Sequence, residues 1–206
     1  MSQAIVKVSP QWLRTTGRFG KAEADRSSVT LHYDEHQPSS RVYCASFESP
    51  IGVIYLASTE RGLCKIALPK DGKASFFSWI KENFPPEGIV DDRKKNSVVI
   101  RQLNEYFIGK RTKFDLDIDL IGTNFQQRLW TELTKTGYGT VITYKQLGKR
   151  LHTKGYRAIG ATVSKNPVPI VIPCHRVVGS DSKLVGYSGG IRLKEYLLRL
   201  EGIILI

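Results

Sequence analysis

The chain of 206 residues has no apolar run that approaches the roughly 20 residues needed to cross a membrane. Its first residues, Met1–Ala4, do not lead into the apolar segment of a secretory signal peptide. Both absences argue against a membrane or secreted protein. We therefore expect an intracellular protein, located in the cytoplasm of a prokaryote or in the nucleus of a eukaryote.

Cysteine is also scarce. The three cysteines, Cys44, Cys64 and Cys174, fit neither a CxxC pair nor a zinc-knuckle spacing. An odd number of cysteines in an intracellular chain argues for free thiols rather than a disulfide framework. We expect no metal site, and one of the thiols could be reactive.

Acidic residues are few relative to basic ones. The chain has 31 Lys and Arg against 19 Asp and Glu, a net charge of +12. Residues 1–118 hold 18 basic and 14 acidic residues, a net of +4, and residues 119–206 hold 13 and 5, a net of +8. A positive field concentrated on the C-terminal part favours a polyanionic partner such as nucleic acid, although composition alone also fits a generally basic surface.

Three regions follow from the pattern along the chain. Residues 1–40 are polar, and we predict an extension with little structure, with short turns or a helix near Pro10–Leu13 left open. Residues 41–118 form a first domain. Its apolar segments predict an antiparallel meander of strands around Val42–Phe47, Ile54–Ala57 and Leu63–Leu68.

Two helices should follow in this first domain. One contains the aromatic residues Phe76, Phe77 and Trp79 and ends before Pro85, and the other carries apolar residues at helical spacing from Val98 until Gly109. Residues 114–120 then alternate strictly between apolar and acidic side chains. This segment predicts an edge strand or a linker, and it marks the domain boundary.

The C-terminal domain, residues 119–206, should be mainly helical. Thr123 or Asn124 can cap a first helix, and Thr143 is suited to cap a helix over 144–151. A polar turn leads to a helix over 156–165, and two short helices joined by a glycine-containing turn are typical of a helix-turn-helix. The small residues of the second helix, including Ala158 and Gly160, suit either close approach to a groove or tight packing between helices.

The segment Pro173-Cys174-His175-Arg176-Val177 follows an apolar run, Val168–Ile172, that looks like a buried strand. A cysteine beside a histidine is a candidate activated thiol, because the thiolate is the nucleophile and a nearby base removes its proton. Most cysteines after an apolar run are small core residues, so both interpretations stay open on this segment alone.

Further segments extend the pattern: Gly122-Thr-Asn-Phe-Gln-Gln-Arg-Leu-Trp130, Tyr138-Gly-Thr-Val-Ile-Thr-Tyr144, Arg157-Ala-Ile-Gly160, Asn166-Pro-Val-Pro, Gly186-Tyr-Ser-Gly-Gly190, Lys194-Glu-Tyr-Leu-Leu198 and Glu201-Gly202. Together with the Cys-His segment, they resemble the O6-alkylguanine-DNA alkyltransferases densely over residues 120–202 and more loosely over 41–118. The resemblance implies an α/β (α+β) fold, in which an N-terminal ribonuclease-H-like antiparallel-sheet domain precedes a C-terminal winged helix-turn-helix domain. It also implies direct, irreversible repair of O6-alkylguanine in double-stranded DNA.

The resemblance assigns the chemistry to named residues. After base flipping, Cys174 would accept the alkyl group in a single turnover, His175 would take the thiol proton through a water, and Glu201 would orient His175. Asn166 would tie the preceding turn to the active-site segment. Tyr144 would help to rotate the nucleotide, although a partly buried tyrosine whose hydroxyl contacts water is the alternative.

The remaining assignments concern the pocket and the DNA. Pro169, Val177, Gly186, Tyr187 and Ser188 would line the pocket for the flipped base. Arg157 would fill the space that the base leaves, although a phosphate-contacting arginine is the alternative. The helix with Arg157 would lie in the minor groove, and the DNA-binding set also includes Tyr144, Ala158, Lys145 and Lys165, with Lys149 and Lys154 as further candidates for phosphate contacts.

The resemblance implies no cofactor, no obligate protein partner and a monomer. Some relatives hold a structural zinc, but the matching positions here are Ser40, Thr59 and Cys64, so we predict none. The turn at residues 136–139 departs from the Ile-Pro that usually precedes the aromatic-Gly pair. Alkyl groups on O4 of thymine could also be substrates.

Three other classes remain to be weighed. A lesion sensor on the same fold would lack the cysteine, so the presence of Cys174 argues against it. A winged-helix transcription factor would not need the combination of Tyr144, Arg157 and Tyr187. A cysteine peptidase does not fit an adjacent Cys-His pair in a basic helix-turn-helix domain.

Overall fold

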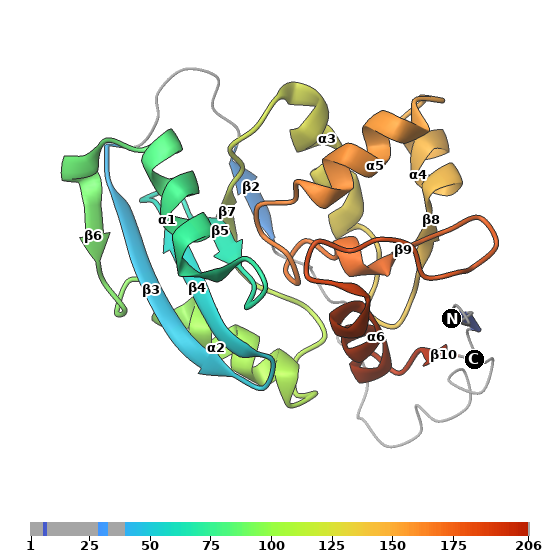
Figure 1. Cartoon of the computed structure of the whole chain (residues 1–206), viewed down its shortest axis with the longest axis horizontal. Coiled ribbons are helices and arrows are strands. Elements are labelled where there is room, and N and C mark those ends of the chain that lie inside the picture. The colour runs from blue at the N-terminus through green and yellow to red at the C-terminus, as the bar shows by residue number, and fades with distance from the viewer. Residues whose placement is uncertain (1–5, 8–28, 33–39, 206) are drawn as a thin grey trace.

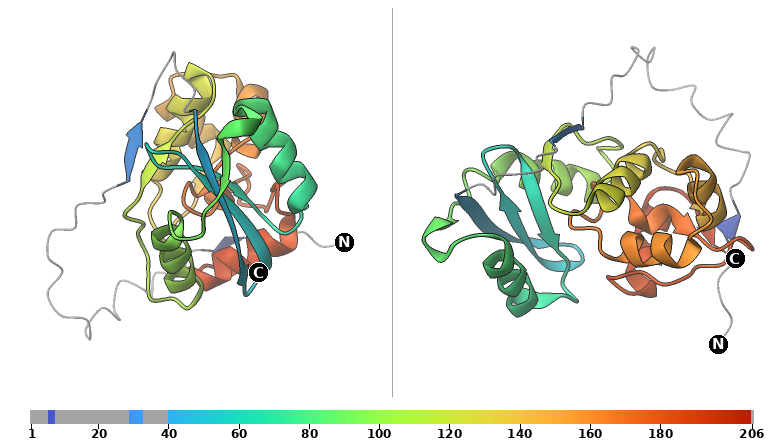
Figure 2. Two further views of the ribbon diagram at one scale, coloured as in Figure 1. Left: turned by 90° about the vertical axis from the view of Figure 1, so that its left-hand side faces the viewer. Right: turned by 90° about the horizontal axis from the view of Figure 1, so that it is seen from above.

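The computed structural model describes residues 6–7, 29–32 and 40–205. A sheet-containing half and a mainly helical half lie side by side (Figure 1, and Figure 2 in the view from above). The possible turn or helix near residues 10–13 lies outside the described residues. None of the helices in the described part of the chain has the length and apolar character needed to cross a membrane.

A six-stranded mixed sheet forms the first half. The predicted meander is confirmed, since β3 (Val42–Ser49), β4 (Gly52–Ser58) and β5 (Leu63–Ala67) pair antiparallel in sequence order. The full order is β2-β7-β5-β4-β3-β6. The three flanking strands, which pair parallel to their neighbours, are β2 (Thr30–His32), β6 (Ile89–Asp91) and β7 (Asp117–Asp119).

The segment expected to be an edge strand or a linker is neither. Within it, β7 is an internal strand, because β2 pairs with its outer side in the register Leu31 to Ile118. The extension over residues 1–40 is therefore not structureless where the structure describes it. Besides β2, it contributes β1 (Val6–Lys7), which pairs antiparallel with β10 (Ile204–Leu205) at the other end of the chain.

Helices cover the two faces of the sheet. Helix α1 (Gly72–Asn83) packs Phe76 and Ile80 against Ala57 and its neighbours on one face. Helix α2 (Ser97–Phe107) packs on the other face with the alternate residues of the same strand, such as Leu56. This alternation follows from the two-residue repeat of a strand. A short 3-10 helix, η2 (Pro86–Gly88), follows α1.

The helical half begins with α3 (Asn124–Thr134), which is capped by Thr123. Thr143 caps α4 (Tyr144–Arg150). Each threonine forms a capping box with a glutamine three residues later, so both predicted helix starts are confirmed. Helix α5 (Tyr156–Ser164) completes the helix-turn-helix. Gly148 permits the close packing, because a Cβ there would stand 2.9 Å from the backbone oxygen of Thr153.

The last part carries the predicted site. The 3-10 helix η3 (Cys174–Arg176) leads into β9 (Val177–Val178), which pairs parallel with β8 (Ile142–Thr143). Helix α6 (Ile191–Leu200) then ends at Glu201. One apolar core runs through both halves, from the sheet and α2 to Trp130 and Leu197. The backbone amide of Ile66 on β5 also donates to the carbonyl of Pro167, which fixes the segment before η3 against the sheet.

Candidate functional site

The segment that leads to Cys174 is a buried turn and not the strand expected from its apolar sequence. The amide of Ile172 donates to the carbonyl of Val168 at 2.9 Å, and an isolated bridge joins Pro169 to Ile172. Ile170 has a φ of 76°, a conformation that a β-branched residue adopts only under constraint. The surrounding core holds this turn, and Cys174 begins η3 behind it.

The side-chain amide of Asn166 holds this turn together. Its Nδ2 donates to the carbonyl of Ile172 at 2.8 Å and to Sγ of Cys174 at 3.0 Å. Its Oδ1 accepts from the amide of Val168 at 3.0 Å. Both ends of the side-chain amide are therefore used, and one residue sets the shape of the turn and the position of the sulfur.

The Cys174 thiol is almost inaccessible, with 2% of the residue exposed. Burial raises its pKa to about 11, while the hydrogen bond from Asn166 and the nearby charge of Lys194 act in the opposite direction. The thiol therefore holds its proton at neutral pH. A nucleophilic role requires a base that removes this proton as the reaction proceeds.

His175 is suited to be such a base. It is completely buried, and burial lowers its pKa below the usual value, although Glu201 acts against this shift. Its Nε2 lies 2.8 Å from Oε1 of Glu201, and because that carboxylate is ionised, Nε2 carries the hydrogen. The other nitrogen, Nδ1, is buried and has no hydrogen-bond partner among the described residues. A neutral imidazole with a free Nδ1 can accept a proton.

Glu201 is a buried carboxylate with several donors around it. Arg176 binds it through Nε at 2.9 Å and through its Nη2 at 2.9 Å, which is a two-pronged ion pair. Tyr106 donates to Oε1 at 2.8 Å, and the amide of Gly139 donates to Oε2 at 3.3 Å. Burial raises the pKa of Glu201, but His175 and Arg176 outweigh it and bring the pKa to about 2. The group therefore stays charged.

A buried lysine connects the two sides of the site. The Nζ of Lys194 on α6 donates to the carbonyl of Val177 and, at 2.9 Å, to the carbonyl of Val185. Burial lowers its pKa to about 8. Lys194 thus links the segment after Cys174 to the loop that leads to Gly186.

That loop forms a cavity of about 270 Å³ with α4 and α5. The residues that line it are Tyr144, Gly160, Val163, Ser164, Gly186, Tyr187 and Ser188. Four of the residues predicted for the pocket or for rotating the base therefore meet here. Burial raises the pKa of Tyr144, and the neighbouring Cys174 adds to this effect, so its phenol keeps its proton. The hydroxyl of Tyr187 is buried without a partner among the described residues.

Two predicted pocket residues, Pro169 and Val177, are buried and do not line this cavity. Pro169 belongs to the turn before Cys174, and Val177 belongs to β9. A contact with a ligand stays a prediction for both.

The predicted DNA-binding residues lie on the exposed side of the helix-turn-helix. Arg157, Ala158 and Lys165 are exposed on or just after α5, and Lys145 is exposed on α4. The buried side of α5 carries Ile159, Thr162 and Val163, so Ala158 faces outward and does not serve helix packing. This outcome favours the interpretation that the small residues allow close approach to a groove.

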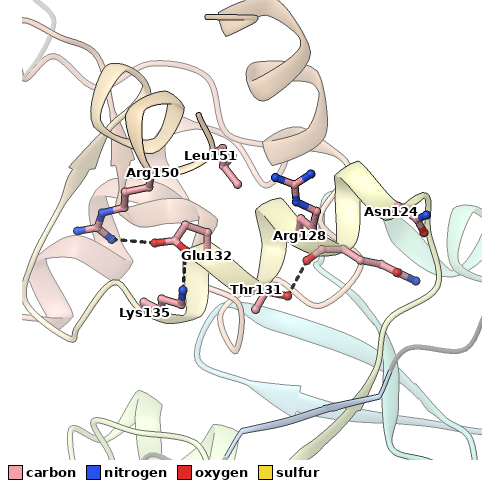
Figure 3. A pocket seen from close by; sticks show the side chains of 8 residues that line it. Asn124, Arg128, Thr131, Glu132, Lys135, Arg150 and Leu151 are labelled. Atoms are coloured by element: carbon pink, nitrogen blue, oxygen red, sulfur yellow. Dashed lines mark hydrogen bonds and ion pairs between the residues drawn. The ribbon is translucent and has the colours of Figure 1, made fainter. Parts of the chain in front are cut away.

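A larger depression, of about 540 Å³, lies elsewhere between α3 and α4 (Figure 3). Glu132 contributes to its wall and forms ion pairs with Lys135 at 2.7 Å and Arg150 at 3.5 Å. None of the predicted site residues lines it. Its size therefore does not make it the site of the chemistry.

Two of the three positions compared with the family's zinc site, Thr59 and Cys64, make hydrogen bonds within the protein, and the third, Ser40, is exposed. The hydroxyl of Thr59 donates to Asp119 at 2.7 Å, and Sγ of Cys64 donates to the carbonyl of Ala57 at 3.3 Å. Burial raises the pKa of Cys64 well above its usual value and that of Cys44 to about 11. Neither thiol has the partners that would make it reactive.

The sequence did not reveal every residue of the site. Arg176 and Lys194 stand inside the motifs that were recognised, so their identity was visible although their contacts were not. Tyr106 had no such signal, because it lies 95 residues from Glu201 and reads as an apolar position of a helix. The amide of Gly139 contacts Glu201 from a backbone with a φ of 69°. The glycine after an aromatic residue in the Tyr138-Gly139 turn was a possible signal for this conformation.

Two family models match the chain. One, described as the ribonuclease-like domain of 6-O-methylguanine DNA methyltransferase, matches residues 42–120. The other, described as the DNA binding domain of the same methyltransferase, matches residues 124–203. Together they cover both halves of the fold described above.

Curated relatives and solved structures agree with these models. The methylated-DNA–protein-cysteine methyltransferase of Methanosarcina barkeri is 40% identical over 161 residues, which is 78% of this chain and 97% of the relative. The protein of the same name from Mycobacterium leprae is 36% identical over 78% of this chain and 92% of its own length. The crystal structure of Mycobacterium tuberculosis OGT in complex with DNA is 34% identical, covers 77% of this chain and 92% of its own, and has a TM-score of 0.68.

Proposed function

This chain belongs to the 6-O-methylguanine DNA methyltransferase family, and on that premise we propose that Cys174 is the residue to which it transfers the alkyl group. The protein is a methylated-DNA–protein-cysteine methyltransferase, and it repairs DNA by alkyl transfer. The choice of Cys174 is supported by its surroundings, since Asn166 contacts its sulfur and the His175–Glu201 pair follows it. Among the residues that the structure describes, Cys44 and Cys64 have no such partners.

The transfer is a displacement at the alkyl carbon. The sulfur of Cys174 forms a bond to this carbon while the bond from the carbon to O6 of guanine breaks, and guanine leaves with the bonding electrons. The thiol proton goes to Nδ1 of His175, directly or through a water. The ion pair with Glu201 stabilises the imidazolium that results. Because a thioether is inert to ordinary reductants, each molecule acts once.

The base must leave the duplex to reach the buried sulfur. We assign the 270 Å³ cavity to the flipped guanine, with Tyr187, Ser188 and Gly186 as its wall. Tyr144 at the start of α4 lines this cavity and neighbours Cys174, and its protonated phenol can donate to the leaving guanine. We assign Arg157, which is exposed on α5, to fill the vacated position in the stack.

The substrate is double-stranded DNA that contains O6-alkylguanine. We assign the contact to the face of α4 and α5 that carries Lys145, Arg157, Ala158 and Lys165. The net charge of +8 on residues 119–206 supports this choice, because the attraction to phosphates needs no base sequence. We also propose that residues 41–118 and 119–206 act as the two domains, and that the protein works as a monomer.

The observation that carries the proposal is the set of contacts around one sulfur: Asn166 on Sγ, and the Glu201–His175 pair beside it. The test is to treat the protein with duplex DNA that carries O6-methylguanine and to map the methylated peptide by mass spectrometry. The methyl group should appear on Cys174. A Cys174→Ala variant should bind the same DNA without accepting the methyl group, and methylation of Cys44 or Cys64 instead would overturn the assignment.

A further inference from the structure

The acceptor oxygen that orients His175 also receives a hydrogen bond from the other half of the molecule. Tyr106 lies on α2, on the face that packs against the sheet, and its hydroxyl donates to Oε1 of Glu201 at 2.8 Å. The same Oε1 lies 2.8 Å from Nε2 of His175. Nη2 of Arg176 also donates to this oxygen, at 2.9 Å. Three side chains therefore share one carboxylate oxygen, and of these only Tyr106 comes from the sheet-containing half of the fold.

The side chains of this hydrogen-bonded group are shielded from solvent. Tyr106, His175 and Glu201 are 0%, 0% and 4% exposed. In such surroundings a hydrogen bond to an ion is stronger than at the surface, and leaving one group without its partner is costly. The direction of the bond is also fixed: burial and the Glu201 carboxylate keep the proton on Tyr106, so the phenol is always the donor.

Aromatic packing holds the phenol in place. The ring of Tyr106 lies 5.6 Å from that of Phe114 and 6.2 Å, edge on, from that of Tyr138, measured between centroids. Tyr138 has a phenol in the same cluster, but its hydroxyl donates to the backbone carbonyl of Leu200 at 2.8 Å and not to the carboxylate. The cluster thus contains the buried phenol of Tyr106 and the partly buried phenol of Tyr138, and of these two only Tyr106 bonds to the carboxylate of Glu201.

We propose that Tyr106 is a positioning residue for the alkyl transfer, through which the ribonuclease-like domain fixes Glu201 and limits how strongly this carboxylate holds the proton on His175. The inference rests on the proposed function of Cys174 and His175. It gives α2 a part in the reaction through Glu201 and His175.

The physical effect has two parts. A carboxylate that accepts a bond from Tyr106 has its charge spread over an additional donor, so it stabilises the His175 imidazolium less than a bare carboxylate would. The bond also restrains the rotation of the carboxylate, and with it the direction in which Nδ1 of His175 points. Losing the hydroxyl should therefore raise the pKa of His175 and loosen its orientation.

Other groups around the imidazole are unchanged by this substitution. Arg176 and Lys194 carry positive charges that oppose protonation of His175, and Tyr187 packs edge on at 6.5 Å between ring centroids. The Cys174 thiol is protonated at neutral pH. Around Glu201, Arg176 and the amide of Gly139 remain as donors. A change in the titration of His175 in a Tyr106 variant thus reports on the lost phenol.

The test compares Tyr106→Phe with Tyr138→Phe as a matched control, since each removes one hydrogen-bonded phenol hydroxyl from the same aromatic cluster. The single-turnover rate of methyl transfer from duplex DNA is measured from pH 5 to pH 9. We expect Tyr106→Phe to slow transfer at neutral pH by roughly three- to tenfold and to move the lower limb of the profile up by roughly half a pH unit. Tyr138→Phe should leave the position of that limb unchanged.

A second measurement does not depend on activity. The pKa of His175 is followed by NMR of the imidazole in wild type and in both variants, and it should rise only in Tyr106→Phe. If Tyr106→Phe loses stability and rate but neither the profile nor the imidazole titration moves, Tyr106 is only a packing residue and the proposal is wrong. If instead the wild-type protein transfers no methyl group to Cys174, the proposed function itself fails, which is a separate outcome.

Discussion

Asn166 donates a hydrogen bond of 3.0 Å to the sulfur of Cys174, and the same nitrogen holds the carbonyl of Ile172 at 2.8 Å. The side chain that shapes the turn is thus also the one that touches the nucleophile. The pKa of Cys174 reflects both facts, because burial raises it and the Asn166 bond opposes the rise. Fold and reactivity are coupled at this point.

Replacing Asn166 with Ala should therefore lower both the stability of the fold and the reactivity of Cys174. The buried amide of Val168 and the carbonyl of Ile172 would lose their partner, and we expect a loss of about 2–4 kcal/mol in the free energy of unfolding. Without the bond to its sulfur, Cys174 should also react more slowly with iodoacetamide at fixed pH. Chemical denaturation and alkylation rates measure the two effects.

The control is Asn104→Ala, at an exposed position of α2. An Asn166→Ala protein that is as stable and as reactive as wild type would contradict this account.

Acidification should destabilise the protein through His175. Burial holds the pKa of His175 below its unfolded value of about 6.5, so the unfolded chain binds a proton that the folded one does not. Stability from this group is therefore lost as the pH falls below about 6.5, at up to about 1.4 kcal/mol per pH unit. Glu201, whose folded pKa is lowered to about 2, adds a further loss as the pH falls below about 4.3. Thermal melting at a series of pH values measures the effect in wild type and in His175→Gln. Between pH 7 and pH 5 the stability of wild type should fall more steeply with falling pH than that of His175→Gln, and the two pH dependences should be parallel only above neutral pH. Parallel pH dependences from pH 7 to pH 5 would count against a buried neutral His175.

Arg157→Ala should slow repair in duplex DNA far more than on an O6-methylguanine presented in a single strand. Arg157 is exposed on α5 whereas Cys174 is buried, so we expect its role to be in stabilising the extruded base and not in the displacement. Single-turnover rates on both substrates measure the difference. Arg128→Ala on α3 removes an equal charge at another exposed position. Equal losses on the two substrates would assign Arg157 to the chemistry or the fold.

Binding to undamaged duplex should weaken steeply with salt and depend little on sequence. A module of this size makes roughly three to six phosphate contacts, which gives a log-log slope of about −3 to −5. The double variant Lys145→Gln, Lys165→Gln should make the slope shallower by about two. Fluorescence anisotropy over a salt series measures this. Lys94→Gln, Lys110→Gln, at exposed positions in the sheet half, is the charge-matched control and should leave the slope unchanged. The contacts would lie elsewhere if only the control pair changed the slope.

The features that the sequence predicted well are those with local signals. Thr123 and Thr143 each precede a helix by one residue and have glutamine three positions later, so the caps could be read directly. The meander was visible because β3, β4 and β5 are separated by short turns. The site residues around Cys174 came from a resemblance to a known family and not from periodicity.

The features that the sequence did not predict depend on distant partners. A short apolar run such as Val168–Ile172 has the same sequence pattern whether it forms a strand or a buried turn, because the pattern indicates only that the segment is buried. The place of β7 inside the sheet depends on β2, which lies in the extension and pairs with it across more than eighty residues of sequence. The bond from Tyr106 to Glu201 is of the same kind. The local sequence pattern of either segment does not indicate a partner that lies so far away in the chain.

The stoichiometry of repair tests the central claim most directly. The protein is incubated with an excess of duplex DNA that carries O6-methylguanine, and the intact mass of the protein and the amount of repaired DNA are measured together. The account predicts that every molecule exchanges one proton for one methyl group, on the peptide that contains Cys174, and that repair stops when the protein is consumed. Repair that continues past one lesion per molecule, or a protein whose mass does not change while lesions disappear, would contradict it.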